Sequence, residues 1–230
     1  MKKLLLIYFL SFHAISELTL EITQGTEDPY RVAIIKFSGA EKATTDIQKV
    51  VFDNLLRTGE FTIFNNEDLL SIPQIEEDIV FNDFRILDID FLVMGKVEDD
   101  GLNIAVEYQV FDISKAKKIR TSTVYGIPNK NRQLAHYVSD GIYQEITGIP
   151  GIASTKILYV TEDNNFKLLI SDADGSNEQV LLESTEPIIS PSWSPDSKKV
   201  AYVSFETGIA KVYIQDIASG NRQVAVENSS

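Results

Sequence analysis

The chain has 230 residues, a formal net charge of −13 at pH 7 and no cysteine. This length allows one or two domains. A nucleic-acid-binding face needs clustered lysine and arginine, so the acidic balance argues against nucleic acid as a partner. The absence of cysteine excludes disulfides, thiolate nucleophiles and cysteine-ligated metals.

Residues 1–16 have the pattern of a secretory signal peptide. Lys2 and Lys3 precede a short apolar run, 4–15, which ends in small residues suited to cleavage. A membrane-spanning helix needs about 20 apolar residues, so this run is too short to anchor the chain. We expect export, cleavage between Ser16 and Glu17, and a mature protein that does not span the membrane.

The mature chain is expected to begin with an α/β domain over residues 17–148. Residues 17–22 alternate polar and apolar side chains, which is the period of a strand with one exposed face. A flexible break at 25–29 follows. The apolar run 31–37 then predicts a buried strand.

A first helix is predicted between this strand and residue 59. Thr45 or Asp46 can cap its N-terminus through a side-chain oxygen. Gly59 follows its end, where a left-handed residue commonly terminates a helix. Four apolar residues fall on one stripe of this first helix: Ile47, Val50, Val51 and Leu55.

The acidic stretch 65–83, with Pro73, indicates a loop or a helix boundary.

A meander of three strands follows this stretch. The runs 91–97 and 102–108 flank the turn 99–101, and an Asp-Gly turn between two strands predicts a hairpin. A third strand is expected over 118–125. The fold class predicted for this domain is α/β, with a mixed sheet and two helices.

The second helix is predicted from four-residue spacing. Leu134, Val138 and Ile142 repeat on one face, and Gly148 follows the end. The segment 148–151, with two glycines and a proline, cannot continue a helix and is interpreted as an interdomain linker.

Two segments recur after the linker with a spacing of 43 or 44 residues. Residues 157–160 return as 200–203, and 170–172 return as 214–216. A repeat of about 40–45 residues with several short strands is the signature of β-propeller blades. Since closed propellers have about four to eight blades, residues 149–230 predict only about the first two. The chain is therefore expected to be a fragment of a longer protein.

The motif Trp193, Ser194, Pro195 and Asp196 is interpreted as propeller architecture. Pro195 and Asp196 favour a tight turn, and Trp193 is expected to pack between blades. The segment 172–175, Asp-Ala-Asp-Gly, resembles a calcium loop but lacks the closing glutamate, so we interpret it as a hairpin turn.

No arrangement of residues in the sequence indicates catalysis. There is no Gly-x-Ser-x-Gly nucleophile elbow, no phosphate-binding loop and no dinucleotide fingerprint. His136 is the only histidine outside the predicted signal peptide and is interpreted as a surface or hydrogen-bonded side chain. We predict no catalytic residue, no cofactor and no metal site.

These features, in this order, resemble the TolB family of the periplasmic Tol–Pal system of Gram-negative bacteria. The most specific stretches are 188–196 and 200–208, together with the preceding α/β domain. The resemblance implies a periplasmic, non-enzymatic monomer whose propeller binds the lipoprotein Pal. It also implies that the mature N-terminal segment binds TolA as a switch. That segment is Glu17, Leu18, Thr19, Leu20, Glu21, Ile22, Thr23, Gln24 and Gly25.

The same resemblance implies a role in outer-membrane integrity and in envelope constriction at cell division. The alternative from another class is the propeller of a secreted prolyl-oligopeptidase-like peptidase, whose blades also carry Trp-Ser-Pro-Asp. That enzyme needs a hydrolase domain with a nucleophile elbow, so the rest of the reading frame discriminates the two. A ligand-binding sensor propeller is a third hypothesis, for which the sequence names no pocket residue.

Overall fold

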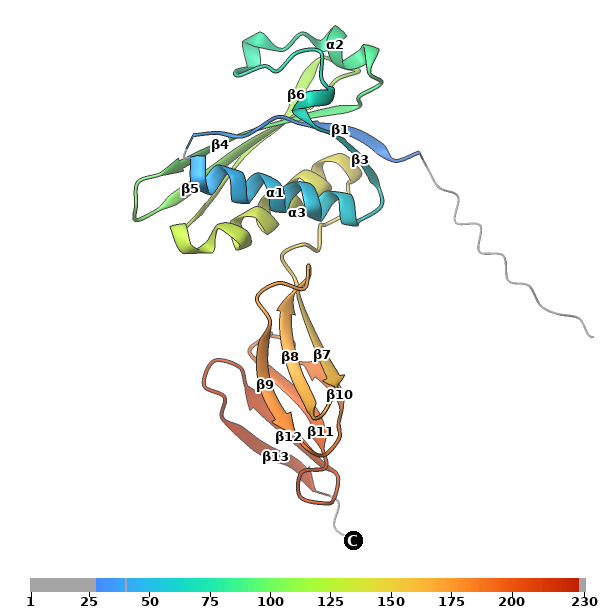
Figure 1. Cartoon of the computed structure of the whole chain (residues 1–230), viewed down its shortest axis with the longest axis vertical. Helices are drawn as coiled ribbons and strands as arrows, with labels where there is room; N and C mark the ends of the chain where they lie inside the picture. Colours follow the sequence, from blue (N-terminus) through green and yellow to red (C-terminus); the bar gives the residue numbers. More distant parts are fainter. Residues whose placement is uncertain (1–27, 40, 228–230) are drawn as a thin grey trace, which may run out of the picture.

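The computed structural model describes residues 28–39 and 41–227. An α/β part lies above two β-sheets, and a single connecting segment joins them (Figure 1). The predicted signal peptide, its cleavage site and the segment 17–25 lie outside the described residues. Within the described ranges, no helix is long and apolar enough to cross a membrane.

The α/β part is built on one mixed sheet. The strand order is β3-β1-β4-β5-β6, and β2 also pairs with β4. β1 runs parallel to β3 and β4, whereas β4, β5 and β6 form an antiparallel meander. The elements are β1 (Tyr30–Ile34), β2 (Ser38–Gly39), α1 (Glu41–Arg57), β3 (Phe61–Phe64), η1 (Asn66–Asp68), η2 (Glu76–Asp78), α2 (Phe81–Ile86), β4 (Phe91–Asp99), β5 (Ile104–Asp112), β6 (Lys117–Gly126), η3 (Pro128–Lys130) and α3 (Asn131–Thr147).

Helix α1 begins at Glu41, several residues before the predicted caps. The prediction of Thr45 or Asp46 as N-cap is therefore wrong. Threonine and aspartate are tolerated inside helices, and the polar first turns carry no apolar stripe that would reveal them. The stripe itself is confirmed, because its four apolar residues are all buried. Gly59, just beyond the helix, has a φ of +75°.

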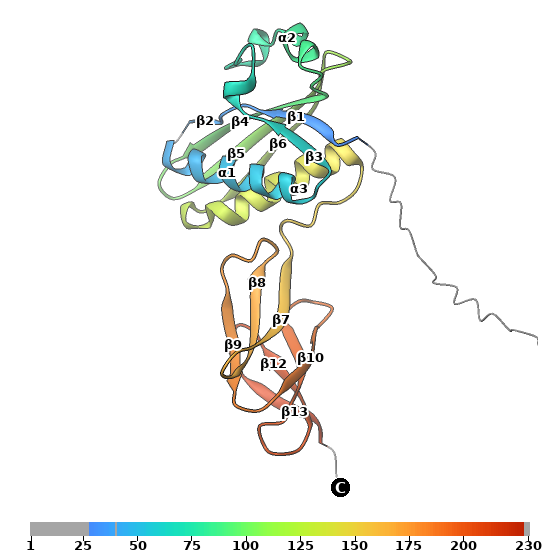
Figure 2. The same cartoon turned by 45° about the vertical axis from the view of Figure 1, so that its right-hand side comes forward.

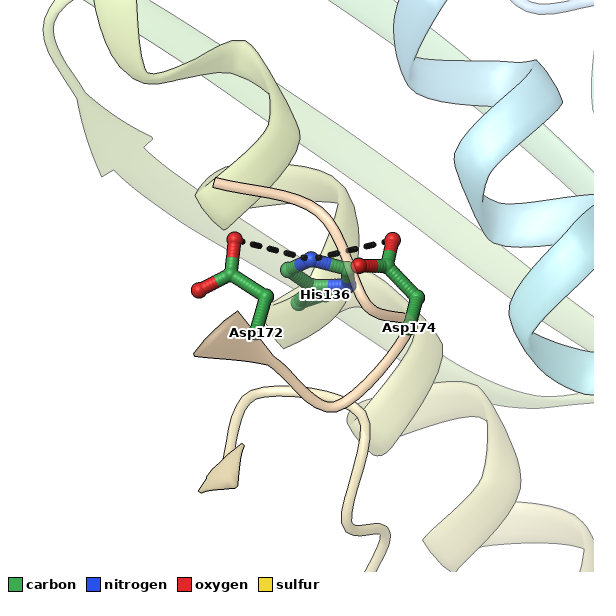
Figure 3. Close-up of side chains that lie close together, drawn as sticks. All are labelled: His136, Asp172 and Asp174. Atoms are coloured by element: carbon green, nitrogen blue, oxygen red, sulfur yellow. Dashed lines mark ion pairs between the residues drawn. The ribbon is translucent and has the colours of Figure 1, made fainter. Parts of the chain in front are cut away.

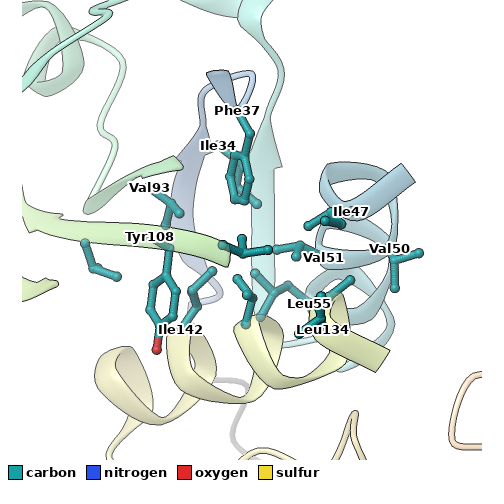
Figure 4. Packing of buried hydrophobic residues seen from close by; sticks show 14 of the residues in the cluster. Ile34, Phe37, Ile47, Val50, Val51, Leu55, Val93, Tyr108, Leu134 and Ile142 are labelled. Atoms are coloured by element: carbon teal, nitrogen blue, oxygen red, sulfur yellow. The ribbon is translucent and has the colours of Figure 1, made fainter. Parts of the chain in front are cut away.

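Successive side chains of β1 enter two different cores. Val32 and Ile34 point to the face covered by α1 and α3, and Ala33 and Ile35 point to the opposite face. Figure 4 shows the first core, to which Ile34 of β1, Val51 of α1 and Ile142 of α3 contribute side chains. Because both faces of the sheet are covered here, residues 32–35 form a continuous apolar run rather than an alternating one.

The segment between β3 and β4, which includes the acidic stretch 65–83, covers the second face of the sheet. Ile79, Phe84 and Ile89 are buried there against β4 and β5. This segment contains η1, η2 and the short helix α2, which the sequence did not predict. A helix of six residues is too short to show the helical period.

The propeller part consists of two stacked antiparallel sheets (Figure 2). Side chains from both sheets share one core, including Leu168, Ile188 and Tyr202. The predicted fold class, an α/β domain followed by about two blades, is confirmed. The strands are β7 (Lys156–Glu162), β8 (Phe166–Asp172) and β9 (Gln179–Ser184) in the first sheet, and β10 (Ile188–Trp193), β11 (Lys199–Ser204), β12 (Lys211–Asp216) and β13 (Arg222–Glu227) in the second.

The sequence repeat has a structural counterpart. Residues 157–160 lie in β7 and their repeat lies in β11, while 170–172 end β8 and their repeat ends β12. Asp172 and Asp216 therefore occupy equivalent positions. Each begins a turn. The backbone N–H of Asp172 donates to the carbonyl of Ser176, and that of Asp216 donates to the carbonyl of Asn221, at 2.8 Å in both cases.

Candidate functional site between helix α3 and the first blade

Helix α3 carries a polar row beside its apolar face. Arg132, His136 and Asp140 follow one another at four-residue spacing, so they lie on one side of the helix. Arg132 forms an ion pair with Asp174 of the first blade. Asp140 accepts hydrogen bonds from two backbone amides of the connecting segment, at 2.6 and 3.0 Å. The row thus holds both the connecting segment and the first blade against the helix.

The first blade contributes two carboxylates from the end of β8 and its turn. Asp172 accepts hydrogen bonds from Lys156 Nζ at 2.6 Å and from Asn177 Nδ2 at 2.5 Å. Asp174 accepts a hydrogen bond from the Ser176 amide at 2.9 Å in addition to its ion pair with Arg132. Both carboxylates are therefore satisfied before any contact with His136 is counted.

The imidazole of His136 points between these two carboxylates (Figure 3). Its Nε2 lies 3.7 Å from Asp172 Oδ2 and 3.6 Å from Asp174 Oδ2. His136 is only 2% exposed, and Nε2 has no hydrogen-bond partner among the residues that the structure describes. Residues that lie 36 and 38 positions apart in the sequence thus meet at one buried point.

The other ring nitrogen is held by helix α1. Asn54 Nδ2 lies 2.9 Å from His136 Nδ1 and donates to Ser139 Oγ at 3.0 Å. Ser139 Oγ in turn donates to the Ala135 carbonyl, and Arg57 donates to Asn54 Oδ1. Since guanidinium can only donate, the amide orientation is set, and Nδ1 of His136 must accept. The proton of the neutral ring therefore sits on Nε2.

The ionisation of the cluster follows from this packing. Burial lowers the pKa of His136, and the carboxylates of Asp174 and Asp172 offset only part of that effect. Burial alone would raise the pKa of Asp172, but Lys156 and Asn177 outweigh it and hold that pKa below its ordinary value. The pKa of Asp174 is likewise lowered, by Ser176 and Arg132 against burial. At neutral pH the ring is neutral and both carboxylates are charged.

The three side chains also lie within the span of a metal site, with their ligand-type atoms within 4.8 Å of one another. Their hydrogen bonding disfavours a cation. The facing oxygen of Asp174 already binds Arg132, and that of Asp172 already binds Asn177. Nε2 carries the proton, whereas a metal ligand needs a free lone pair. The cluster is thus better suited to hold the two parts of the molecule together than to hold a metal.

A cleft of about 340 Å³ adjoins the cluster. Ser139 and Asp140 of α3 line it together with the end of α1 and the connecting segment. The apolar part of its wall includes Leu55, Tyr143, Ile149, Pro150, Ile152 and Ala173.

The predicted propeller motif lies in the second blade. Trp193 ends β10 and packs, half-buried, against the core shared by the two sheets. Ser194 Oγ donates to Asp196 Oδ1 at 2.6 Å, and the Lys198 amide donates to the same oxygen at 3.1 Å. Pro195 sits between them in the turn before β11.

Sequence reasoning missed the cluster around His136. It treated His136 as an isolated side chain and residues 172–175 as a hairpin turn, and the latter do lie in the β8–β9 turn. The sequence signal that points to the cluster is the row Arg132, His136 and Asp140, whose four-residue spacing places three polar side chains on one side of the helix. Its partners could not be named, because they come from another part of the fold.

Both parts of the chain match models of one protein family. Residues 18–119 match the TolB amino-terminal domain, and residues 143–230 match the TolB beta propeller domain. The chain belongs to the TolB family. The two matches cover most of the α/β part and the blades in the order in which the structure has them, so the predicted resemblance is confirmed.

Individual relatives agree with this assignment. The chain is 39% identical to the Tol-Pal system protein TolB of Alcanivorax borkumensis over 215 residues, covering 90% of this chain and 49% of that protein. It is 36% identical to the protein of the same name from Marinomonas sp., covering 90% of this chain and 50% of the relative. The crystal structure of TolB from Acinetobacter baumannii matches with a TM-score of 0.79 and 33% identity, over 87% of this chain and 50% of that one. The chain thus spans about half the length of these relatives.

Proposed function

We propose that this protein is a non-enzymatic periplasmic scaffold of the Tol–Pal system. In this role its propeller binds the lipoprotein Pal, and its mature N-terminal segment, 17–25, binds TolA. The match of both parts of the chain to TolB domains carries the proposal. The expected consequence is support of outer-membrane integrity and of envelope constriction at cell division.

The surroundings of His136 support a role without catalysis. It is the only histidine among the described residues. The hydroxyl nearest to it in the network, Ser139 Oγ, is buried and donates its proton to a backbone carbonyl. A serine peptidase of the prolyl-oligopeptidase type would need an accessible hydroxyl that gives its proton to the histidine. We expect no hydrolysis of proline-containing peptides by the purified protein.

The TolA segment is proposed to bind by adding a strand to an exposed sheet edge of TolA. Leu18, Leu20 and Ile22 alternate with polar residues, so they can face one side of such a strand. Gly25 and the following polar residues would let the segment detach from the α/β part. Backbone hydrogen bonds would supply affinity, and the three apolar side chains would fix the register.

Calorimetric titration of TolA into the full-length protein that carries this sequence tests the proposal. Deleting residues 17–25 is expected to abolish TolA binding while leaving Pal binding and the melting curve unchanged. A matched pair of variants separates the two faces: serine at Leu18, Leu20 and Ile22, against alanine at Thr19, Glu21 and Thr23. We expect the first to lose at least about tenfold in affinity and the second to bind almost normally.

Two results would contradict this proposal. Unchanged TolA affinity after the deletion would exclude the segment as the binding site. A large loss of stability on deletion would show that the segment is a permanent strand of the α/β part.

A further inference from the structure

His136 connects three elements that are distant in the sequence. Its ring is packed between α1, α3 and the turn after β8. The charged and titratable groups that surround it are Arg132 and Asp140 from α3, Arg57 from α1 through Asn54, Lys156 from β7, and Asp172 and Asp174 from β8 and its turn.

The closed junction fits only the neutral ring. Nδ1 accepts from Asn54, and Nε2–H faces the two carboxylates. Protonation would place a second N–H on Nδ1, directly against the Asn54 amide that now donates to it. Asn54 could respond only by turning over, which would break its bonds to Ser139 and Arg57. Ser139 could not compensate without giving up its bond to Ala135.

The carboxylates are poorly placed to accommodate a charged ring. Asp172 is already neutralised by Lys156, and Asp174 by Arg132. Both lie beyond normal hydrogen-bond distance from Nε2, at 3.6 to 3.7 Å. A buried cation without close, unshared counter-charges is costly. If the first blade moves away from the helices, the ring reaches water and can accept a proton freely.

We propose that this cluster is an acid-released latch, in which proton uptake by His136 undocks the first blade from helices α1 and α3. The proposal does not depend on the identity of any binding partner. It makes the arrangement of the two parts of the chain sensitive to the pH around the protein.

The direction of the pH effect follows from the difference in the pKa of His136 between the open and the closed junction. In the open junction the ring has the ordinary pKa of 6.5, and in the closed junction burial holds it lower. Docking is therefore fully stable above pH 6.5 and weakens as the pH falls below that value. If the closed form stays neutral, the equilibrium constant for opening at pH 5 rises by about 25-fold over its value at pH 7.

The titration of His136 is measured directly by NMR. The chain contains two histidines, and a His136→Gln variant identifies the resonance of interest by its loss. We expect this resonance to titrate below 6.5. Asp172→Asn should lower the midpoint further, because the Asp172 charge raises the pKa of His136. Asp216→Asn, at the equivalent position of the second blade, should leave the titration unchanged.

Undocking is measured with a pair of labels. Cysteines are introduced at Leu102 and Ile209, which are 78% and 46% exposed and lie in hairpins of the two parts. Because the chain has no cysteine, only these sites react. The distribution of distances between the two labels is recorded at pH 7.5 and at pH 5. We expect it to lengthen and broaden at pH 5 in the unsubstituted chain, and to stay unchanged in His136→Gln, whose neutral amide cannot take a proton.

The outcomes separate cleanly. A His136 pKa at or above 6.5 would overturn the latch, as would a distance distribution that does not change at pH 5. An equal change in His136→Gln would also overturn it, because opening would then have another cause. If His136→Gln does not fold, His136→Asn takes its place, and the titration of the unsubstituted chain still decides.

Discussion

Asp112, at the end of β5, closes the turn into β6. Its Oδ1 accepts from Ser114 Oγ at 2.7 Å and from the Lys115 amide at 2.9 Å, and its Oδ2 binds Lys115 Nζ at 2.7 Å. The residue is 6% exposed. Burial alone would raise the pKa of this carboxyl, but the bonds from Lys115 and Ser114 outweigh it and lower the pKa to about 2. The charged form is therefore the form that stabilises the fold.

Replacement of Asp112 by asparagine tests this contribution. The folded pKa of about 2 lies below the ordinary 3.8, so the stabilisation is present above pH 3.8 and is lost as the pH falls toward 2. We expect Asp112→Asn to lower the free energy of unfolding by about 1–2 kcal/mol at pH 7 and by little at pH 2. Urea unfolding at both pH values measures the difference. Asp53→Asn, which removes an exposed pair with Lys49, is the control and should change little.

At the scale of elements, Gly141 sets the distance between α3 and the sheet. A Cβ at this position would lie 1.9 Å from the hydroxyl oxygen of Tyr108 in β5. Tyr108 is 2% exposed and enclosed by the main core, so it cannot move aside easily. Helix propensity favours alanine over glycine by about 1 kcal/mol, but the steric conflict opposes it.

We expect the steric term to exceed the propensity term. Gly141→Ala should lower the free energy of unfolding by about 1–3 kcal/mol, as measured by denaturant unfolding. Adding Tyr108→Phe removes the closest atom and should recover part of the loss, although the ring carbon Cζ would still lie 2.8 Å away. The exposed Gln144→Ala is the control, expected within about 0.5 kcal/mol of the original chain. A more stable Gly141→Ala would mean that helix and sheet lie farther apart.

At the scale of the whole molecule, the two parts have separate hydrophobic cores. The α/β part buries side chains on both faces of its sheet. The blades share a smaller core and leave large apolar side chains exposed, including Val180, Ile189 and Val224. We propose that residues 17–148 fold without the blades, and that the blades unfold first. Unpaired strands at the edges of a short stack of sheets give little protection.

Two optical signals test this order. Trp193 is the only tryptophan of the chain and lies in the second blade, so its fluorescence reports on the blades. The long helices α1 and α3 lie in the α/β part, so helical circular dichroism reports on that part. We expect the fluorescence transition in urea to precede the dichroism transition, and limited proteolysis to leave a core ending near Gly151. Coincident transitions would show that the contacts between the parts couple them into one unit.

The predictions that held depend on short-range periodicity. Three features reflect a local pattern of apolar side chains. They are the stripe of α1, the Asp-Gly hairpin and the sequence repeat in which β7 corresponds to β11. The misplaced start of α1 and the missing α2 have the opposite cause. Polar first turns and a six-residue helix carry no such pattern, and α2 is distinguished only by the packing of Phe84 on the second face of the sheet.

The sequence by itself determined the class of each part, the order of the parts and the family, because apolar periods and repeat motifs act over a few residues at a time. Only the tertiary structure decided how the parts meet. His136 was interpreted from sequence as a surface or hydrogen-bonded side chain, and only the fold places its ring between Asp172 and Asp174 of the first blade. Its tautomer depends on Asn54, 82 residues away on α1. Such contacts carry no local signal, because burial and hydrogen-bond partners are set by chain segments that become neighbours only on folding.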